Sequence, residues 1–82
     1  MIKLIEAHYQ GEFQLALRFS DGKDGMFDGR ALLKRDGPLL EPLRDEAYFK
    51  RAFIDAGALS WPNGLELSPA RLHQTCRALT TV

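Results

Sequence analysis

The stretch from Phe13 to Phe19 reads FQLALRF and alternates apolar residues with polar or small ones. Successive side chains of a β-strand point to opposite faces, so one face carries every large apolar side chain of this stretch. The pattern predicts a strand with one buried face, and the segments on either side are expected to pair with it. The predicted buried residues are Phe13, Leu15, Leu17 and Phe19, and the predicted outer residues are Gln14, Ala16 and Arg18.

The segment before this strand, residues 2–9, is rich in β-branched and aromatic residues and predicts a second strand. Gln10-Gly11-Glu12 is expected to form the turn between the two strands. A shift of the pairing by one residue would exchange the buried and exposed faces. Two registers stay open: one buries Ile2 and Leu4, and the other buries Ile5, Ala7 and Tyr9.

The turn after the strand contains Ser20-Asp21-Gly22 and permits two loop lengths. A two-residue Asp-Gly loop is the usual choice, but here it would place an apolar residue opposite an acidic one. A three-residue loop instead pairs Arg18 with Asp24 and Leu15 with Phe27, which cross-strand pairing favours. We predict the three-residue loop, with its glycine in the left-handed region.

The same reasoning applies to residues 59–67, which read LSWPNGLEL. A two-residue Asn-Gly loop would put Trp61 opposite Glu66. Proline presets the backbone angle for the first position of a three-residue loop, and glycine accepts the left-handed third position. We therefore predict a type I turn closed by a glycine bulge. The predicted pairs are Trp61 with Leu65, Ser60 with Glu66 and Leu59 with Leu67.

The middle of the chain is expected to be less regular. Asp28 is a good N-cap for a helical turn over residues 28–33, and Asp36-Gly37-Pro38 is expected to end that turn. Residues 39–43 are expected to be irregular, because the prolines at 38 and 42 lack backbone donors. Asp45 is expected to cap a short helix that runs through residue 51.

A strand at residues 52–56 is expected next, and the clearest helix signal lies at the C-terminal end. Ser68 is a good N-cap and Pro69 a good first helical residue. Apolar residues at helical spacing are expected to face the sheet: Leu72, Cys76 and Leu79.

The predicted order of elements is β-β-β-α-α-β-β-α, in a single domain that spans residues 1–82. Runs of strands with segregated helices indicate the α+β class, here an antiparallel sheet of hairpins with a packed C-terminal helix. The hydrophobic content of 45% is enough for a core. A chain of this length is close to the size at which a single core is only marginally stable.

The charge composition predicts no long-range electrostatic attraction to large charged partners. Lys and Arg number 11, as do Asp and Glu, so the formal net charge is zero and neither nucleic acid nor a membrane is an expected partner. No signal peptide is evident, and no apolar run approaches the ~20 residues that span a bilayer. The one cysteine, Cys76, excludes an intrachain disulfide, so a cytoplasmic location is expected.

Residues with catalytic or metal-binding chemistry are few. His73 and Cys76 lie three apart on the predicted helix, but they supply two ligands where zinc takes three or four from protein. Cys76 is expected in the core and His73 near the surface. The three aspartates around the first hairpin match no calcium loop and are expected to serve a turn, an ion pair and a helix cap. They are Asp21, Asp24 and Asp28. No catalytic residue, metal or cofactor is therefore expected.

Candidates for partner binding come from the C-terminal third. Arg71 and Arg77, with Gln74 between them, would form a basic stripe on the last helix. The balanced charge favours a solvated face over a phosphate contact. Tryptophan is common both in cores and in binding hot spots, and the pairing with Leu65 favours the core or its rim for Trp61. The candidate partner-binding residues are Trp61, Asn63, Gly64, Arg71 and Arg77.

Residues 61–69, WPNGLELSP, followed by Leu72, resemble the domain-of-unknown-function family 2442 of small bacterial proteins. Residues 15–22, LALRFSDG, resemble the second strand and turn of that family, and residues 28–33 are also similar to it. The resemblance covers nearly the whole chain. It implies an α+β domain without established enzymatic activity and with no agreed catalytic residues.

The resemblance also implies a context. Some relatives carry a helix-turn-helix after this domain, and others are encoded beside proteins of domain-of-unknown-function family 4160, in the manner of toxin–antitoxin or partner modules. Since the chain ends soon after the predicted helix, no appended DNA-binding domain is expected.

The leading hypothesis is a non-enzymatic, antitoxin-like interaction or regulatory module. Its expected partner is another small protein, such as one of family 4160, or a second copy of itself. The first alternative is a nucleic-acid-binding regulator. The second is a small-ligand binder or enzyme that uses the three aspartates or His73.

Overall fold

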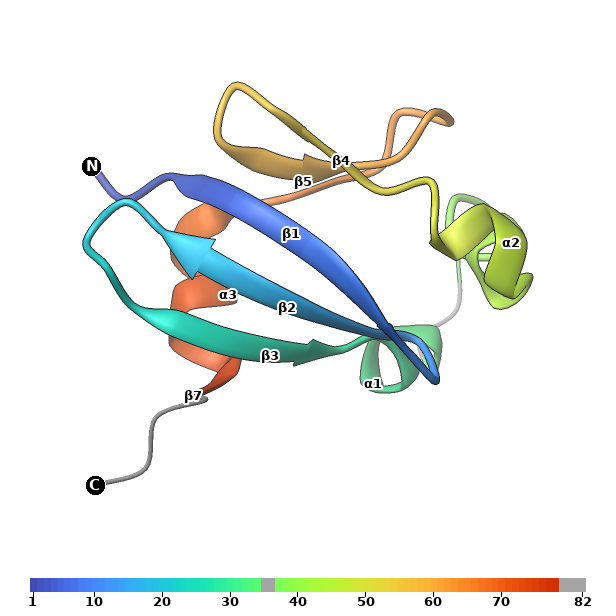
Figure 1. The fold of residues 1–82 in the computed structure, drawn as a ribbon. Helices are drawn as coiled ribbons and strands as arrows, with labels where there is room; N and C mark the ends of the chain where they lie inside the picture. The colour runs from blue at the N-terminus through green and yellow to red at the C-terminus, as the bar shows by residue number, and fades with distance from the viewer. Residues whose placement is uncertain (35–36, 79–82) are drawn as a thin grey trace.

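Two antiparallel sheets and short helices form the computed structural model, which describes residues 1–34 and 37–78 (Figure 1). Within these residues the larger sheet has the strand order β1-β2-β3-β7 and the smaller one β4-β5-β6. The strands of the larger sheet are β1 (Leu4–Gly11), β2 (Gln14–Phe19), β3 (Asp24–Asp28) and β7 (Arg77–Ala78). The strands of the smaller sheet are β4 (Phe53–Asp55), β5 (Ala58–Ser60) and β6 (Glu66–Leu67). The α+β class is confirmed.

Strand β2 has the predicted faces. Leu15, Leu17 and Phe19 are buried, and Arg18 is exposed on the other side. The three-residue loop to β3 is also confirmed, since Arg18 pairs with Asp24. Its last residue, Gly22, has a φ of +91°, which only glycine adopts at little cost.

Strand β1 combines the two open registers by means of a β-bulge. Leu4 lies opposite Phe19 and Glu6 opposite Arg18, so Ile5 is an extra residue without a partner on β2. A bulge shifts the alternation of faces by one residue. Leu4 is therefore buried before the bulge, whereas Ala7 and Tyr9 pack against the core after it. Of the register that would bury Ile5, Ala7 and Tyr9, only Ile5 departs, because the bulge leaves it 52% exposed.

A second irregularity at Gln10 moves the turn between β1 and β2. The chain reverses at Glu12 and Phe13, whose φ angles are +54° and +61°, rather than at Gln10-Gly11-Glu12 as predicted. Two successive left-handed residues match the twist of an antiparallel hairpin. Phe13 thus lies in the turn instead of β2, and its ring packs edge-on against Phe49 with 5.2 Å between centroids.

The ribbon of residues 59–67 has the predicted register. Leu59 pairs with Leu67 and Ser60 with Glu66, while the Trp61 N–H donates to the Leu65 carbonyl over 3.0 Å. The loop glycine, Gly64, has a φ of +95°. Trp61 is 1% exposed, and its indole N–H donates to the Phe49 carbonyl at 3.0 Å. The tryptophan is thus a central part of the core.

The N-caps of the helices were predicted more accurately than their ends. Asp28 caps α1 (Gly29–Leu33) and Asp45 caps α2 (Glu46–Phe49), which ends before the predicted residue 51. The segment expected to be irregular contains a 3₁₀ helix, η1 (Pro42–Arg44). Of the stop signal after α1, Asp36 lies outside the described residues.

The last helix, α3 (Pro69–Thr75), begins as predicted, with the Ser68 hydroxyl accepting from the Arg71 N–H. It ends earlier than expected, because Cys76 is extended and the chain continues into β7, which pairs with β3. Figure 1 shows α3 lying across one face of the larger sheet. Leu72 and Cys76 are buried in the shared core, and Leu79 lies outside the described residues.

Candidate functional site

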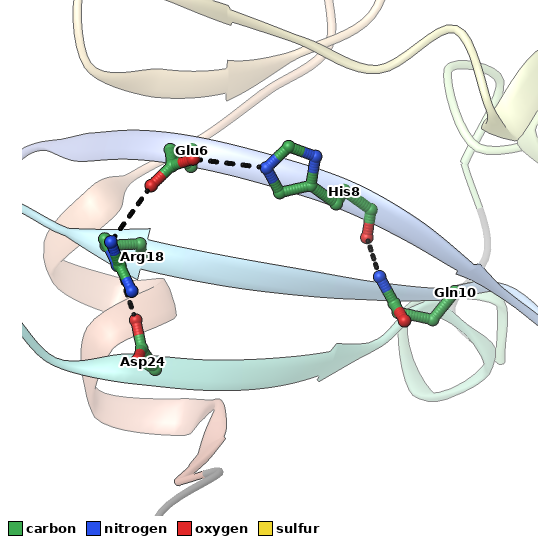
Figure 2. Close-up of polar contacts among 5 residues, drawn as sticks. All are labelled: Glu6, His8, Gln10, Arg18 and Asp24. Atoms are coloured by element: carbon green, nitrogen blue, oxygen red, sulfur yellow. Dashed lines mark hydrogen bonds and ion pairs between the residues drawn. The ribbon is translucent and has the colours of Figure 1, made fainter.

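A row of alternating charges crosses the outer face of the larger sheet (Figure 2). Glu6, Arg18 and Asp24 are cross-strand neighbours on β1, β2 and β3, and we call these three residues the charged row. Arg18 Nε lies 2.9 Å from Asp24 Oδ1, and Arg18 Nη1 lies 3.4 Å from Glu6 Oε2. His8 extends the row, with its Nε2 atom 3.3 Å from Glu6 Oε1.

The charged row is largely open to solvent. The side chain of Arg18 is 53% exposed, and that of Glu6 is 46% exposed. The hydrogen bond to Asp24 raises the pKa of Arg18, so this guanidinium stays charged at every relevant pH. Exposed ion pairs of this kind contribute little to stability, because water and salt screen them. Each charge of the row lies opposite a charge of the other sign on the neighbouring strand, which favours this strand register.

Asp21 and His73 join the first hairpin to α3. His73 Nε2 lies 2.8 Å from Asp21 Oδ2, and the Lys23 ammonium donates to the His73 carbonyl at 2.6 Å. The His73 ring also meets Phe19 edge-on, with 5.0 Å between ring centroids. These contacts hold α3 against the sheet, and we call Asp21, Lys23 and His73 the clasp. The predicted surface position of His73 is accurate for a side chain that is 23% exposed.

The clasp predicts a dependence of stability on pH. The Lys23 N–H, and then the His73 ring, lower the pKa of the Asp21 carboxyl from 3.8. The folded protein thus binds this proton less readily than the unfolded chain does. The contribution to stability is complete above the ordinary pKa and is lost as the pH falls through the lower folded value. We expect Asp21→Asn to weaken the loss of stability below about pH 4, as measured by urea unfolding at several pH values.

The matched control is Asp55→Asn, which changes an exposed aspartate of β4 that has no hydrogen bond or ion pair from its side chain to the rest of residues 1–34 and 37–78. It should leave the acid limb of the stability curve unchanged. Some acid sensitivity should persist in Asp21→Asn, since the Arg30 side chain also lowers the pKa of Asp28. An Asp21→Asn curve parallel to that of the unmodified protein would show that the clasp carries no such linkage.

The predicted reactive residues do not converge on one hollow. Asp24 and Asp28 line separate depressions, one beside the charged row and one beside α1, and Asp21 and His73 line neither. Asp28 serves as the predicted cap and Asp24 as the predicted ion-pair partner. Within residues 1–34 and 37–78, no three His, Cys, Asp or Glu side chains gather as metal ligands would. The prediction of a ligand site at these residues, made as an alternative, finds no support.

A groove with an apolar lining runs between α1 and the β6–α3 segment. It consists of two adjoining hollows of about 210 and 310 Å³ that share Leu32 and Leu67. These volumes are at or below the lower end for small-molecule pockets, and the hollows are open to solvent. We call this surface the apolar groove. Its lining residues are Phe27, Ala31, Leu32, Gly37, Pro38, Leu39, Leu40, Leu65, Leu67, Arg71, Leu72 and Thr75.

The structure places the predicted partner-binding residues in different surroundings. Burial removes Trp61 from this set, because an indole 1% exposed cannot meet a partner while the core is intact. Asn63 donates to the Leu39 carbonyl and accepts from the Leu65 N–H, so its amide holds the loop against the groove wall. Gly64 is exposed at the turn.

Arg71 is exposed and lines the apolar groove. Arg77 lies on β7 rather than on α3, so the predicted helical stripe of Arg71, Gln74 and Arg77 does not form. The physical reason is that the chain leaves the helix after Thr75 to pair with the open edge of β3. The side chain of Arg77 lies outside the described part of the structure.

Comparison with protein families shows which family this chain belongs to. Residues 4–78 match the model of the family described as "Protein of unknown function (DUF2442)". The chain belongs to the DUF2442 family. No curated protein and no solved structure matches it. The DUF2442 segment runs from β1 to β7, so it includes both the charged row and the apolar groove. In the described residues of this DUF2442 chain, no helix has the length and apolarity needed to cross a membrane.

Sequence reasoning missed the apolar groove. Its walls come from two stretches that are distant in sequence, residues 27–40 and 65–75, and α1 is too short for a clear helical face. One signal was present: Leu32 and Leu39 are apolar residues that no predicted core face used. In the structure Leu32 is half-buried and Leu39 is 45% exposed.

Proposed function

We propose that this DUF2442 chain is a non-enzymatic interaction module that binds a segment of another small protein in the apolar groove. The observation that carries the proposal is the continuous apolar lining, in which Leu39 is 45% exposed. Apolar surface that gathers in one groove favours a partner that covers it. The proposed place of action is the cytoplasm, where the free thiol of Cys76 stays reduced.

The dispersal of reactive side chains supports a binding role over catalysis. The Asp21–His73 pair is used to hold α3, and the charged row is solvated. A small partner also suits a chain of 82 residues, because a single core of this size is marginal and gains stability from binding. A protein of domain-of-unknown-function family 4160 remains the partner that the family resemblance suggests.

A nucleic-acid role is less well supported by the geometry. Arg71 lines a groove whose other lining residues are apolar or uncharged, and phosphate recognition normally uses clustered basic side chains. Arg77 does not extend the helical face that carries Arg71.

Affinity capture with a matched pair of variants tests the proposal. Leu39 and Phe53 are both 45% exposed, but Leu39 lies in the groove and Phe53 lies on β4. We expect Leu39→Glu to weaken binding of the captured partner at least tenfold, which is about 1.4 kcal/mol. Phe53→Glu should bind as the unmodified protein does.

An equal loss of binding in Leu39→Glu and Phe53→Glu would mean that the contact lies elsewhere or that both variants are unfolded. Circular dichroism distinguishes these two cases. A protein that crosslinks to nothing but stays monomeric in native cells would contradict the proposal. Crosslinking to a second copy, abolished by Leu39→Glu, would make the partner another molecule of this chain.

A further inference from the structure

One charged side chain stands out in the apolar groove. Among the described residues that line its two hollows, Arg71 is the one that carries a charge. The backbone of Arg71 is held by α3, since its N–H donates to the Ser68 hydroxyl and its carbonyl accepts from the Thr75 hydroxyl. These bonds fix the backbone of Arg71 beside the groove that its side chain lines.

The guanidinium of Arg71 has no carboxylate partner within residues 1–34 and 37–78. Other arginines of the chain are engaged differently. Arg18 lies between Glu6 and Asp24, and Arg30 pairs with Asp28 at 3.2 Å. Arg71 thus presents an uncompensated positive charge to whatever occupies the groove.

A third hollow continues the groove past α1. It shares Phe27, Ala31 and Thr75 with the first, and it adds the Asp28–Arg30 pair. That pair is internally neutralised, so it adds no net charge to the surface. Among the described residues that line the three hollows, Arg71 is therefore the one whose charge is not neutralised by a neighbour.

We infer that the partner segment in the apolar groove is acidic as well as apolar. Its apolar side chains fill the hollows around Leu32 and Leu67, and one carboxylate pairs with Arg71. Arginine matches a carboxylate through two parallel hydrogen bonds, and a rim of apolar atoms reduces competition from water. This inference rests on the proposed function, because it specifies the partner of the same groove.

Selection from a displayed library of random linear peptides tests this chemistry even though the natural partner is unidentified. We expect the selected peptides to carry an aspartate or glutamate close to large apolar residues. Fluorescence anisotropy then measures the affinity of one selected peptide for the unmodified protein, Arg71→Glu, Arg71→Lys and Arg51→Glu. Arg51 is an exposed arginine that lies over the Tyr48 ring, outside the groove, so its variant is a matched charge reversal.

The expected result is a loss of affinity of more than tenfold for Arg71→Glu, because two carboxylates would then face each other. Arg71→Lys should lose less, and Arg51→Glu should bind as the unmodified protein does. A higher salt concentration should reduce the difference in peptide affinity between the unmodified protein and Arg71→Glu, since exposed charges are screened. A peptide in which lysine replaces the acidic residue should bind Arg71→Glu better than the unmodified protein.

Other outcomes would overturn the inference in distinguishable ways. Apolar peptides without an acid that bind Arg71→Glu normally, but fail with Leu39→Glu, would refute the acidic partner and leave the groove function intact. Peptides that bind Arg71→Glu and Leu39→Glu as tightly as the unmodified protein would show that the apolar groove is not the binding site. Binding of duplex DNA that Arg71→Glu abolishes, with no peptide selected, would replace the protein partner with nucleic acid.

Discussion

Replacement of Trp61 by alanine is expected to destabilise the fold severely. The side chain is 1% exposed, lies against Phe49 with 5.7 Å between centroids, and donates to the Phe49 carbonyl. Loss of a buried tryptophan side chain costs about 3–5 kcal/mol. A domain of this length is stabilised by roughly 4–12 kcal/mol in total. Urea unfolding should show a midpoint far below that of the unmodified protein, or no folded baseline.

Trp61→Phe retains much of the buried aromatic surface but loses the hydrogen bond of the indole. It keeps an aromatic ring in the core but removes the donor to the Phe49 carbonyl. That carbonyl also accepts from the Ala52 N–H at 3.3 Å, so it keeps one partner. The lost hydrogen bond should therefore cost near the low end of the range of about 1–3 kcal/mol for an unsatisfied buried group, and the space left by the smaller ring adds to that cost. Equal stability of Trp61→Ala and the unmodified protein would contradict the central position of this side chain.

Gly29→Ala is expected to have the next largest effect, although alanine usually favours a helix over glycine by up to about 1 kcal/mol. Gly29 begins α1, and its N–H donates to the Phe13 carbonyl at 2.7 Å. A Cβ atom there would lie 2.8 Å from that carbonyl oxygen and would overlap the ring of Phe49, which is fully buried. Either α1 or the aromatic cluster has to move, and such overpacking costs about 1–3 kcal/mol.

Gly37→Ala is the matched control, because a Cβ atom at Gly37 would meet Leu40 at an ordinary distance of 3.8 Å. Thermal unfolding should show a clear decrease in the midpoint for Gly29→Ala and little change for Gly37→Ala. A stabilised Gly29→Ala protein would mean that helix propensity outweighs the close approach of α1 to Phe13 and Phe49.

The two hairpin loops could be predicted because their register was decided by matching side chains across strands. Arg18 opposite Asp24 and Trp61 opposite Leu65 each require a three-residue loop, and both pairings are present. The N-caps Asp28, Asp45 and Ser68 were equally readable, since capping depends on a few neighbouring residues.

The remaining features depend on contacts between distant segments. Nothing in the residues after Thr75 forbids another helical turn, but the open edge of β3 takes the chain into β7. The clasp joins Asp21 to His73, which are 52 residues apart. The apolar groove likewise needs α1 beside β6 and α3, a juxtaposition that no local pattern encodes.

The bulges at Ile5 and Gln10 reduce the tendency of this strand to pair with a second copy of the protein. β1 is an outer strand of its sheet, and a straight, unbroken outer strand is a template for stacking one copy upon the next. An inserted residue at each end interrupts the regular ladder of donors and acceptors and increases the local twist. Deletion of Ile5 would make the outer edge of β1 straighter. The expected effects are increased aggregation and a lower stability.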